Sequence, residues 1–254
     1  MRLKIPFLLA LFFAGMTTSP VWCQPFQSVL AELDKNYYYP QNQGVKSFSA
    51  RVQWEQLDVA SGSGKFLRNP DFVFFWNVKS EGGLGLFRLR EGPGSGDRYQ
   101  ELGQQISPFR EAIIPLTLEQ KFLDFEGQVR SMGENQLLVK LNPRAGADLG
   151  YQLLIDTKDQ VIKKLRYEQN NSAKNVEGQF RYLKLDDKLA ISESRSRFKL
   201  QGQEYFETTR YTYKKVEGIW WVHRIDQTLK REGLVLLTYI LKLSDFQITL
   251  FSDP

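Results

Sequence analysis

The sequence predicts an α+β protein built on one strongly curled antiparallel sheet that approaches a barrel, with helical segments that form a lid over it. Three observations favour this fold class. About a dozen segments read as strands, and turn residues separate them. Only residues 26–40 and 107–125 carry apolar side chains at helical spacing. Several strands are also apolar on both faces, so a second layer must cover the face that does not meet the core.

Composition sets the limits of the prediction. The chain has 254 residues, of which 42% are hydrophobic and 25% charged, and this is ordinary for a folded domain. We find no repeat and no linker, so residues 24–254 are expected to form a single domain with an extended C-terminal strand region. One cysteine and one histidine exclude a disulfide framework or a Cys/His metal cluster within the chain. We therefore expect no metal and no cofactor.

The N-terminal stretch MRLKIPFLLALFFAGMTTSPVWCQ resembles a secretory signal, and we assign residues 1–23 to it. Arg2 and Lys4 precede an apolar run, residues 5–15, that is too short to span a bilayer. Cleavage after Cys23 would give an exported protein. The alternative is a lipid-modified Cys23, although the residues directly before it lack the small side chains usual at such a site.

The first half of the domain alternates helical and strand signals. The helix from residue 26 should end at Pro40. Strands follow over 47–59, 65–78 and 84–90, and a loop over 91–103. In the helical region 107–125, Pro115 predicts a break or kink. From residue 128 onward the chain predicts a meander of strands over 128–133, 135–143, 151–157, 161–169, 176–185, 192–200, 206–215, 220–230 and 234–251.

The strand within 68–80 raises the main question about function. Phe72, Phe74 and Trp76 would lie on one of its faces, and Val73 and Phe75 on the other. The strand 234–243 is apolar on both faces as well. An apolar cavity between the curled sheet and the helices would explain this excess. A tightly packed core and a dimer interface are the two alternatives.

Other chemistry finds little support in the sequence. His223 and Asp226 lie close together, but no G-x-S-x-G serine elbow accompanies them, so we expect no enzyme and no catalytic residue. Lysines and arginines alternate with Tyr167, Tyr211 and Tyr213 along several strands. Acidic residues are mixed with them throughout, which favours a solvated outer face over a nucleic-acid surface.

The order of four segments resembles the LolA-type periplasmic lipoprotein carriers. They are SFSARVQ (47–53), GKFLRNPDFVFFW (64–76), SPFREAI (107–113) and KLNPRAGADLGYQLLIDTKDQVIKKLRYEQNNS (140–172), and the match runs in order from about residue 26 to 190. In this outer-membrane lipoprotein-sorting family, an incomplete β-barrel is closed by a helical lid, and its apolar interior takes acyl chains. The resemblance therefore implies that the curled antiparallel sheet of this chain also forms an incomplete β-barrel closed by a helical lid. It also implies a periplasmic carrier or chaperone.

The sequence departs from this family in three places. The family arginine directly precedes the proline, whereas Asn69 separates Arg68 from Pro70 here. The segment EGGLGLF (81–87) replaces the family's Asp-Gly before an aromatic strand. The chain beyond residue 190 is also longer than in the carriers, and it resembles wider lipoprotein-sorting relatives in which extra strands extend the sheet.

The resemblance and the apolar pattern together give a candidate site. We expect Phe75 to point inward and Arg68 to contact a headgroup or the lid. The residues expected to line the apolar cavity are Trp54, Phe75, Phe87, Phe109, Ile113 and Leu116.

The expected function is binding the acyl chains of lipoproteins or lipids and moving them toward the outer membrane. The expected partners are those lipids or lipoproteins, inner-membrane release and outer-membrane acceptor proteins, and a transient membrane contact, with no nucleic acid. The alternative from another class is an envelope regulator or sensor of the same fold that binds a protein partner.

Overall fold

The computed structural model describes residues 25–59, 62–90, 97–144, 149–169 and 175–251. The expected signal segment, residues 1–23, lies outside the described residues, and with it Cys23. Within the described part of the chain, no helix is long and apolar enough to cross a membrane.

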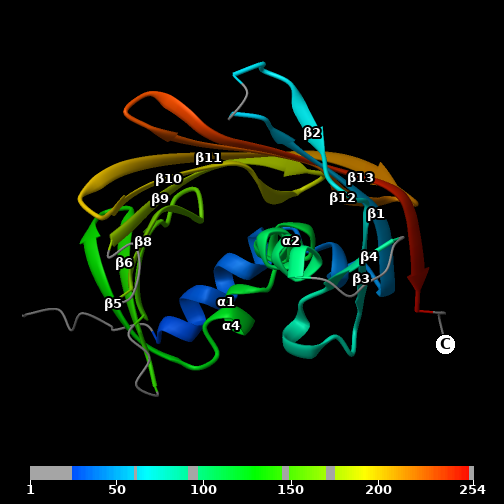
Figure 1. Ribbon diagram of the computed structural model, residues 1–254. Helices are drawn as coiled ribbons and strands as arrows, with labels where there is room; N and C mark the ends of the chain where they lie inside the picture. Colours follow the sequence, from blue (N-terminus) through cyan, green and yellow to red (C-terminus); the bar gives the residue numbers. More distant parts are fainter. Residues whose placement is uncertain (1–24, 60–61, 91–96, 145–148, 170–174, 252–254) are drawn as a thin grey trace, which may run out of the picture.

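The chain builds one antiparallel sheet of 13 strands. The strand order is β4-β3-β1-β13-β12-β11-β10-β9-β8-β7-β6-β5, and β2 pairs with β1 beside this path. The sheet arches strongly, but it is not closed, because β4 and β5 are its two edges (Figure 1). The strands are β1 (Val45–Leu57), β2 (Phe66–Arg68), β3 (Phe72–Asn77), β4 (Leu86–Leu89), β5 (Phe125–Gly133), β6 (Gln136–Pro143), β7 (Leu149–Asp156), β8 (Val161–Gln169), β9 (Asn175–Leu185), β10 (Lys188–Leu200), β11 (Gln203–Val216), β12 (Ile219–Arg231) and β13 (Leu234–Leu250).

Tight turns connect the long C-terminal strands. The turns after β10, β11 and β12 each place a non-glycine residue and then a glycine at positive φ, as at Gln201 (51°) and Gly202 (80°). Two consecutive residues at positive φ are typical of the hairpin turn whose twist matches that of the sheet. The last strand, β13, then pairs with β1, and Trp54 lies opposite Leu241. The first and last strands of the chain therefore join in the middle of the sheet.

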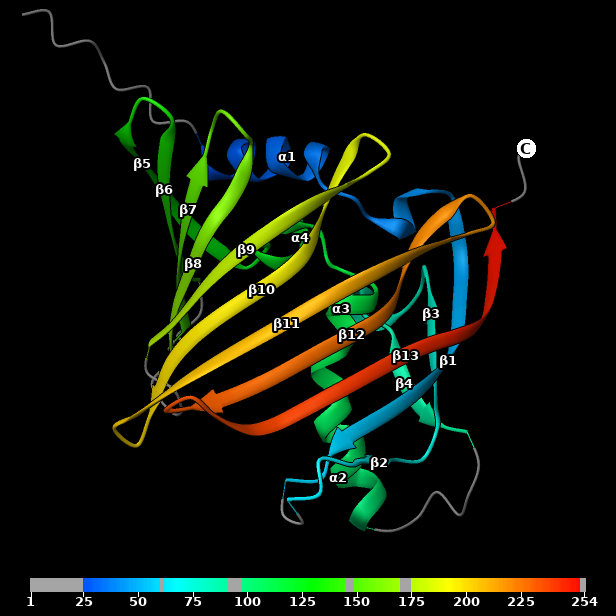
Figure 2. The same ribbon diagram turned by 90° about the horizontal axis from the view of Figure 1, so that it is seen from above.

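The helices lie on the concave side of the arch (Figures 1 and 2). They are α1 (Phe26–Asn36), α2 (Asp97–Ile106), α3 (Arg110–Ile113) and α4 (Leu118–Lys121), with 3₁₀ turns at Pro40–Asn42, Glu81–Gly83 and Ser107–Phe109. Pro115 lies in the break between α3 and α4, where the sequence predicts one. At Gly127 on β5, an added Cβ would lie 2.3 Å from Phe26, so α1 sits directly against the strand.

Helix α2 corrects the expected loop over residues 91–103. Two side chains one turn apart, Leu102 and Ile106, are buried in the core and hold the helix against the sheet. Burial of two such side chains outweighs the cost of about 1 kcal/mol for Gly103 inside a helix.

The expected strand over 65–78 is split at Asn69–Pro70, and its orientation is the reverse of the one expected. Strand β3 pairs with β1, and Phe74 lies opposite the buried Ala50. Phe72, Phe74 and Trp76 consequently point into the core, whereas Phe75 is 39% exposed on the outer face. The expectation that Phe75 points inward is therefore wrong, because the register with β1 fixes which face of β3 is buried.

Two hydrophobic clusters fill the concave side. The larger one joins β1, β3, β12 and β13 to α2 and α3, and Phe48 stacks on Trp221 at its centre with a centroid distance of 4.0 Å. The second joins α1 and Phe122 to strands β6 to β8. A smaller group around Tyr38 and Leu185 lies between them. The space between the two larger clusters contains the candidate site.

Candidate functional site: an apolar cavity under the sheet

A cavity of about 370 Å³ lies between the concave face of the sheet and the segments that follow α1 and α2. The segments on the helical side are residues 37–40 and 108–122. The sheet contributes side chains from β7 to β12, and Phe122 and Leu153 come from one large cluster while Ile113 and Val222 come from the other. The cavity is thus the unfilled space between the two parts of the core.

Tyrosines line much of the cavity, but their hydroxyl groups bond to the protein. The hydroxyl of Tyr37 accepts a hydrogen bond from the backbone N–H of Ile162 (2.9 Å), and that of Tyr182 donates to the Ile162 carbonyl (2.8 Å). The two rings stack with their centroids 5.6 Å apart. Because the backbone of one residue satisfies both hydroxyls, the rings present mainly carbon to the cavity.

Tyr38 and Tyr213 follow the same pattern. The hydroxyl of Tyr38 accepts from the Trp220 N–H, and the hydroxyl of Tyr213 donates to the Ile191 carbonyl, both at 2.8 Å. Burial raises the pKa of both phenols. These side chains therefore stay neutral at physiological pH, and the lining keeps its apolar character.

Residues 115–121 form part of the helical side of the cavity, and we name them the covering segment. Asp34 on α1 accepts hydrogen bonds from the N–H groups of Leu118 (2.8 Å) and Glu119 (3.0 Å). Gln41 donates to the carbonyl of Pro115 (2.6 Å). Polar contacts thus attach the covering segment to α1 and the turn after it, whereas its Leu116 and Leu118 line the cavity.

Thr117 and Gln120 start helix α4 within the covering segment. Thr117 Oγ1 accepts from the Gln120 N–H, and the Gln120 side chain accepts from the Thr117 N–H, which is a capping box. Lys121, at the end of α4, forms an ion pair with Glu111 of α3. Both of these charged side chains also line the cavity, so they are the ionic groups nearest to a bound apolar ligand.

The residues expected at the site are only partly brought together. Ile113 and Leu116 line the cavity. Trp54 is fully buried in the larger cluster, where its ring lies 5.3 Å from that of Tyr239, and Phe109 is buried in the same cluster. Phe87 packs on Phe74 with the centroids 5.1 Å apart. Trp54, Phe87 and Phe109 are thus core residues beside the cavity rather than part of its lining.

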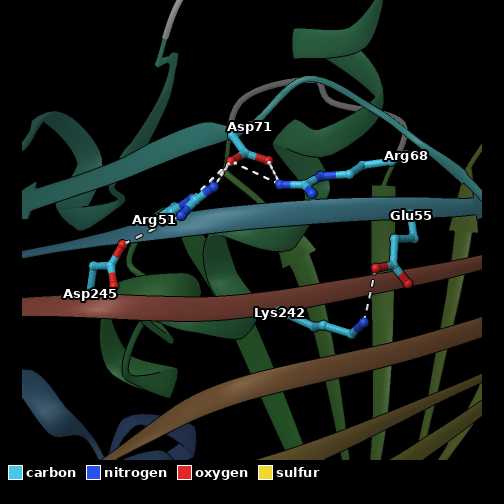
Figure 3. Close-up of polar contacts among 6 residues, drawn as sticks. All are labelled: Arg51, Glu55, Arg68, Asp71, Lys242 and Asp245. Carbon is cyan, nitrogen blue, oxygen red and sulfur yellow. Dashed lines mark hydrogen bonds and ion pairs between the residues drawn. The ribbon is translucent and has the colours of Figure 1, made fainter.

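The sequence predicts that Arg68 contacts the lid or a headgroup. In the structure, Arg68 belongs to a group of ion pairs between residues of β1, β2 and β13 and Asp71, which lies between β2 and β3 (Figure 3). Its guanidinium lies 3.2 Å from the Asp71 carboxylate, which also bonds to Arg51. Burial alone would raise the pKa of Asp71, but hydrogen bonds from the two arginines bring it below its ordinary value. Arg68 is not among the residues that line the cavity.

The sequence also contains a signal for the tyrosines that line the cavity. Three consecutive tyrosines, Tyr37 to Tyr39, directly follow the first helix. In an irregular segment, successive side chains point in different directions, and here all three line the cavity. An aromatic run after a helix, rather than the aromatic strand 72–76, thus contributes to the lining of the cavity.

His223 and Asp226 do not form a catalytic pair in the structure. The Asp226 carboxylate bonds to Arg224 (2.8 and 2.6 Å), and His223 Nδ1 lies 3.1 Å from the carbonyl oxygen of Thr212. Each group therefore has a partner of its own on the sheet.

Comparison with known proteins gives structural similarity only. No protein-family model and no curated protein matches the sequence. The structure is similar to a LolA superfamily protein from Nitrosomonas europaea, with a TM-score of 0.35, 12% identity, and coverage of 91% of this chain and 95% of the other.

Two further solved structures are more distantly similar. A domain described as an outer membrane lipoprotein-sorting protein, from Vibrio parahaemolyticus, has a TM-score of 0.32 and 10% identity, with 87% and 91% of the two chains covered. The Pseudomonas aeruginosa MucA/MucB complex has a TM-score of 0.21 and 7% identity, with 86% and 94% covered. Because these TM-scores are below 0.5, the function proposed below depends on the residues of the cavity.

Proposed function

We propose that this protein is a non-catalytic periplasmic carrier that binds the acyl chain of a lipid or lipoprotein in the cavity and moves it toward the outer membrane. The observation that supports this proposal most directly is the cavity of about 370 Å³, in which the hydroxyls of Tyr37, Tyr38, Tyr182 and Tyr213 bond to the backbone. A dry apolar cavity of about 150 Å³ suffices for benzene, and small-ligand sites occupy about 300–1,000 Å³. The space therefore suits one hydrocarbon chain.

The energetics suit a reversible carrier. Each buried methylene contributes about 0.8 kcal/mol, so ten of them supply about 8 kcal/mol before the cost of immobilising the ligand. Entry and exit need an opening, and in our proposal the covering segment acts as the lid. Its hydrogen bonds to Asp34 and Gln41 are few and involve no strand. Opening the covering segment therefore leaves the sheet intact.

A cavity-filling variant tests this proposal. Leu116→Trp places a larger side chain in the lining, and displacement of two methylenes of ligand lowers affinity about tenfold. Binding is measured with pyrene-labelled hexadecanoic acid. Leu67→Trp, on the exposed strand β2, makes the same exchange away from the cavity and should bind as the wild type does. Equal affinity for wild type and Leu116→Trp, with unchanged circular dichroism, would contradict the proposal.

Native mass spectrometry of protein purified from a periplasmic extract separates the carrier from the regulator. Co-purified lipid supports the carrier. A stable protein partner without lipid would instead favour the envelope regulator, and a lipid-free homodimer would favour an interface through the apolar face.

A further inference from the structure

One row of side chains crosses the convex face near the turns that end β10 and β12. Each member is the cross-strand partner of the next, so the row is continuous over neighbouring strands. We call it the convex row, and its members are Arg166, Glu177, Arg197, Phe206, Lys230 and Val235.

The convex row exposes an aromatic ring between two cations. Phe206 is 44% exposed, and its cross-strand neighbours are Arg197 and Lys230. On β11 it lies four residues before Arg210 and so shares its face, whereas Tyr211 and Tyr213 point into the cavity. The ring therefore faces solvent on the side of the sheet away from the cavity.

More apolar side chains lie at the end of the same strands. The turns between β10 and β11 and between β12 and β13 lie at one end of the sheet (Figure 2). Leu234, beside the second turn, is 67% exposed, and Leu200, beside the first, is exposed as well. Val235 of the convex row follows Leu234 and is also exposed. By strand alternation Leu200 and Leu234 point to the face opposite the convex row, so Phe206 and Val235 are the apolar side chains that share the convex face with its cations.

Charge on the convex face is uneven. The convex row contains three cations and one carboxylate. Next to the row, three further cations, Arg181, Arg195 and Arg210, surround the carboxylate of Glu193. Over β1, β2 and β13, by contrast, Arg51, Arg68 and Lys242 match Asp71, Asp245 and Glu55 (Figure 3). The excess of positive charge therefore lies over β8 to β12, where Phe206 is exposed.

We infer that the convex row and the two adjoining turns bind the surface of a membrane that contains anionic phospholipids. The cations pair with lipid phosphates, and Phe206 and Val235 enter the boundary between headgroups and acyl chains. The choice of an anionic lipid surface depends on the excess of cations over carboxylates around an exposed aromatic ring, because such a surface attracts basic residues and accepts apolar side chains at its boundary. The surface lies apart from the cavity, and this inference is independent of the proposed carrier function.

Vesicle sedimentation tests the inference. The purified protein should bind vesicles of phosphatidylglycerol and phosphatidylethanolamine more tightly than vesicles of phosphatidylcholine, and added salt should weaken the binding. Arg197→Gln and Lys230→Gln should each lower the partition coefficient about fivefold, because one basic residue near such a surface contributes about 1 kcal/mol. Phe206→Ser should lower it at both low and high salt.

Matched variants give the controls. Lys158→Gln removes an exposed charge at the opposite end of the sheet, and Leu123→Ser removes a side chain that is 71% exposed after α4. Both should bind vesicles as the wild type does, and so should the cavity variant Leu116→Trp. The inference is overturned if the wild type does not bind anionic vesicles, or if the controls lose as much binding as the convex-row variants. If the convex row binds only a protein, the wild type will not bind anionic vesicles, and the inference is overturned.

Discussion

The Asp34 carboxylate accepts a hydrogen bond from the backbone N–H of Leu118, although 84 positions separate the two residues in the chain. Asp34 thereby caps α4 from another helix, and it accepts from the Tyr39 hydroxyl as well. A single carboxylate thus joins α1, a cavity-lining tyrosine and the covering segment.

Asp34→Ala should loosen the covering segment. Loss of a capping carboxylate costs about 0.5–2 kcal/mol, so the free energy of unfolding should fall by this amount. If the covering segment is the lid, pyrene-labelled hexadecanoic acid should also dissociate faster in stopped-flow displacement. Glu32→Ala removes an exposed carboxylate on the same helix and should change neither quantity. An unchanged dissociation rate in Asp34→Ala would show that the ligand leaves by another route.

The two faces of β3 should respond very differently to mutation. Phe74→Ala removes a fully buried ring and should lower the free energy of unfolding by about 3–5 kcal/mol. Phe75→Ala removes an exposed ring whose contact is the guanidinium of Arg88, 5.4 Å from its centroid, and should cost about 1 kcal/mol or less. Urea unfolding measures both. Equal losses would mean that the register of β3 against β1 is not the one described.

Glu193 should stabilise the fold more at neutral pH than at acidic pH. Hydrogen bonds from Arg210 and Arg195 lower the pKa of this carboxyl. Its stabilising contribution is therefore complete above the ordinary glutamate pKa of about 4.3 and is lost as the pH falls through the lowered value. Glu193→Gln should be less stable than the wild type at pH 7, and the difference should shrink toward pH 3 in chemical denaturation.

Glu207 should affect the stability of the fold with the opposite dependence on pH. Burial raises its pKa on β11, and the hydrogen bond to Gln227 offsets this only in part. The folded state then loses stability as the pH rises through the raised pKa, because ionisation is easier in the unfolded chain. Glu207→Gln should therefore be more stable than the wild type at pH 8 and similar to it near pH 3. A difference that does not change with pH would exclude this cause.

Much of the sheet could be predicted from the sequence, because alternation of apolar and polar side chains is a local property. The C-terminal meander from residue 128 and the break at Pro115 follow directly from strand patterning and proline chemistry. Helix α2 was missed because the glycines around residues 93–103 suggested a loop, whereas Leu102 and Ile106 are buried by contacts distant in sequence.

The cavity was harder to predict than the strands. Ile113 and Leu116 were placed at the cavity because they lie on either side of Pro115 in an apolar segment. Phe75 was misplaced because both faces of β3 are apolar, and only its pairing with β1 decides which face is buried. Tyr37 and Tyr38, after α1, are held by bonds from Ile162 and Trp220, more than 100 positions away, and no local pattern specifies such contacts.

The sheet is open between its two edge strands, β4 and β5, and this affects how the sheet can deform. A closed barrel has a fixed circumference, and widening it requires rupture of a ladder between two strands. Among the described strands, no ladder joins β4 to β5, so the arch can flatten or tighten while every strand keeps its neighbours. In the proposed carrier, we therefore expect flexing of the sheet as a whole to adapt the width of the cavity to acyl chains of different thickness.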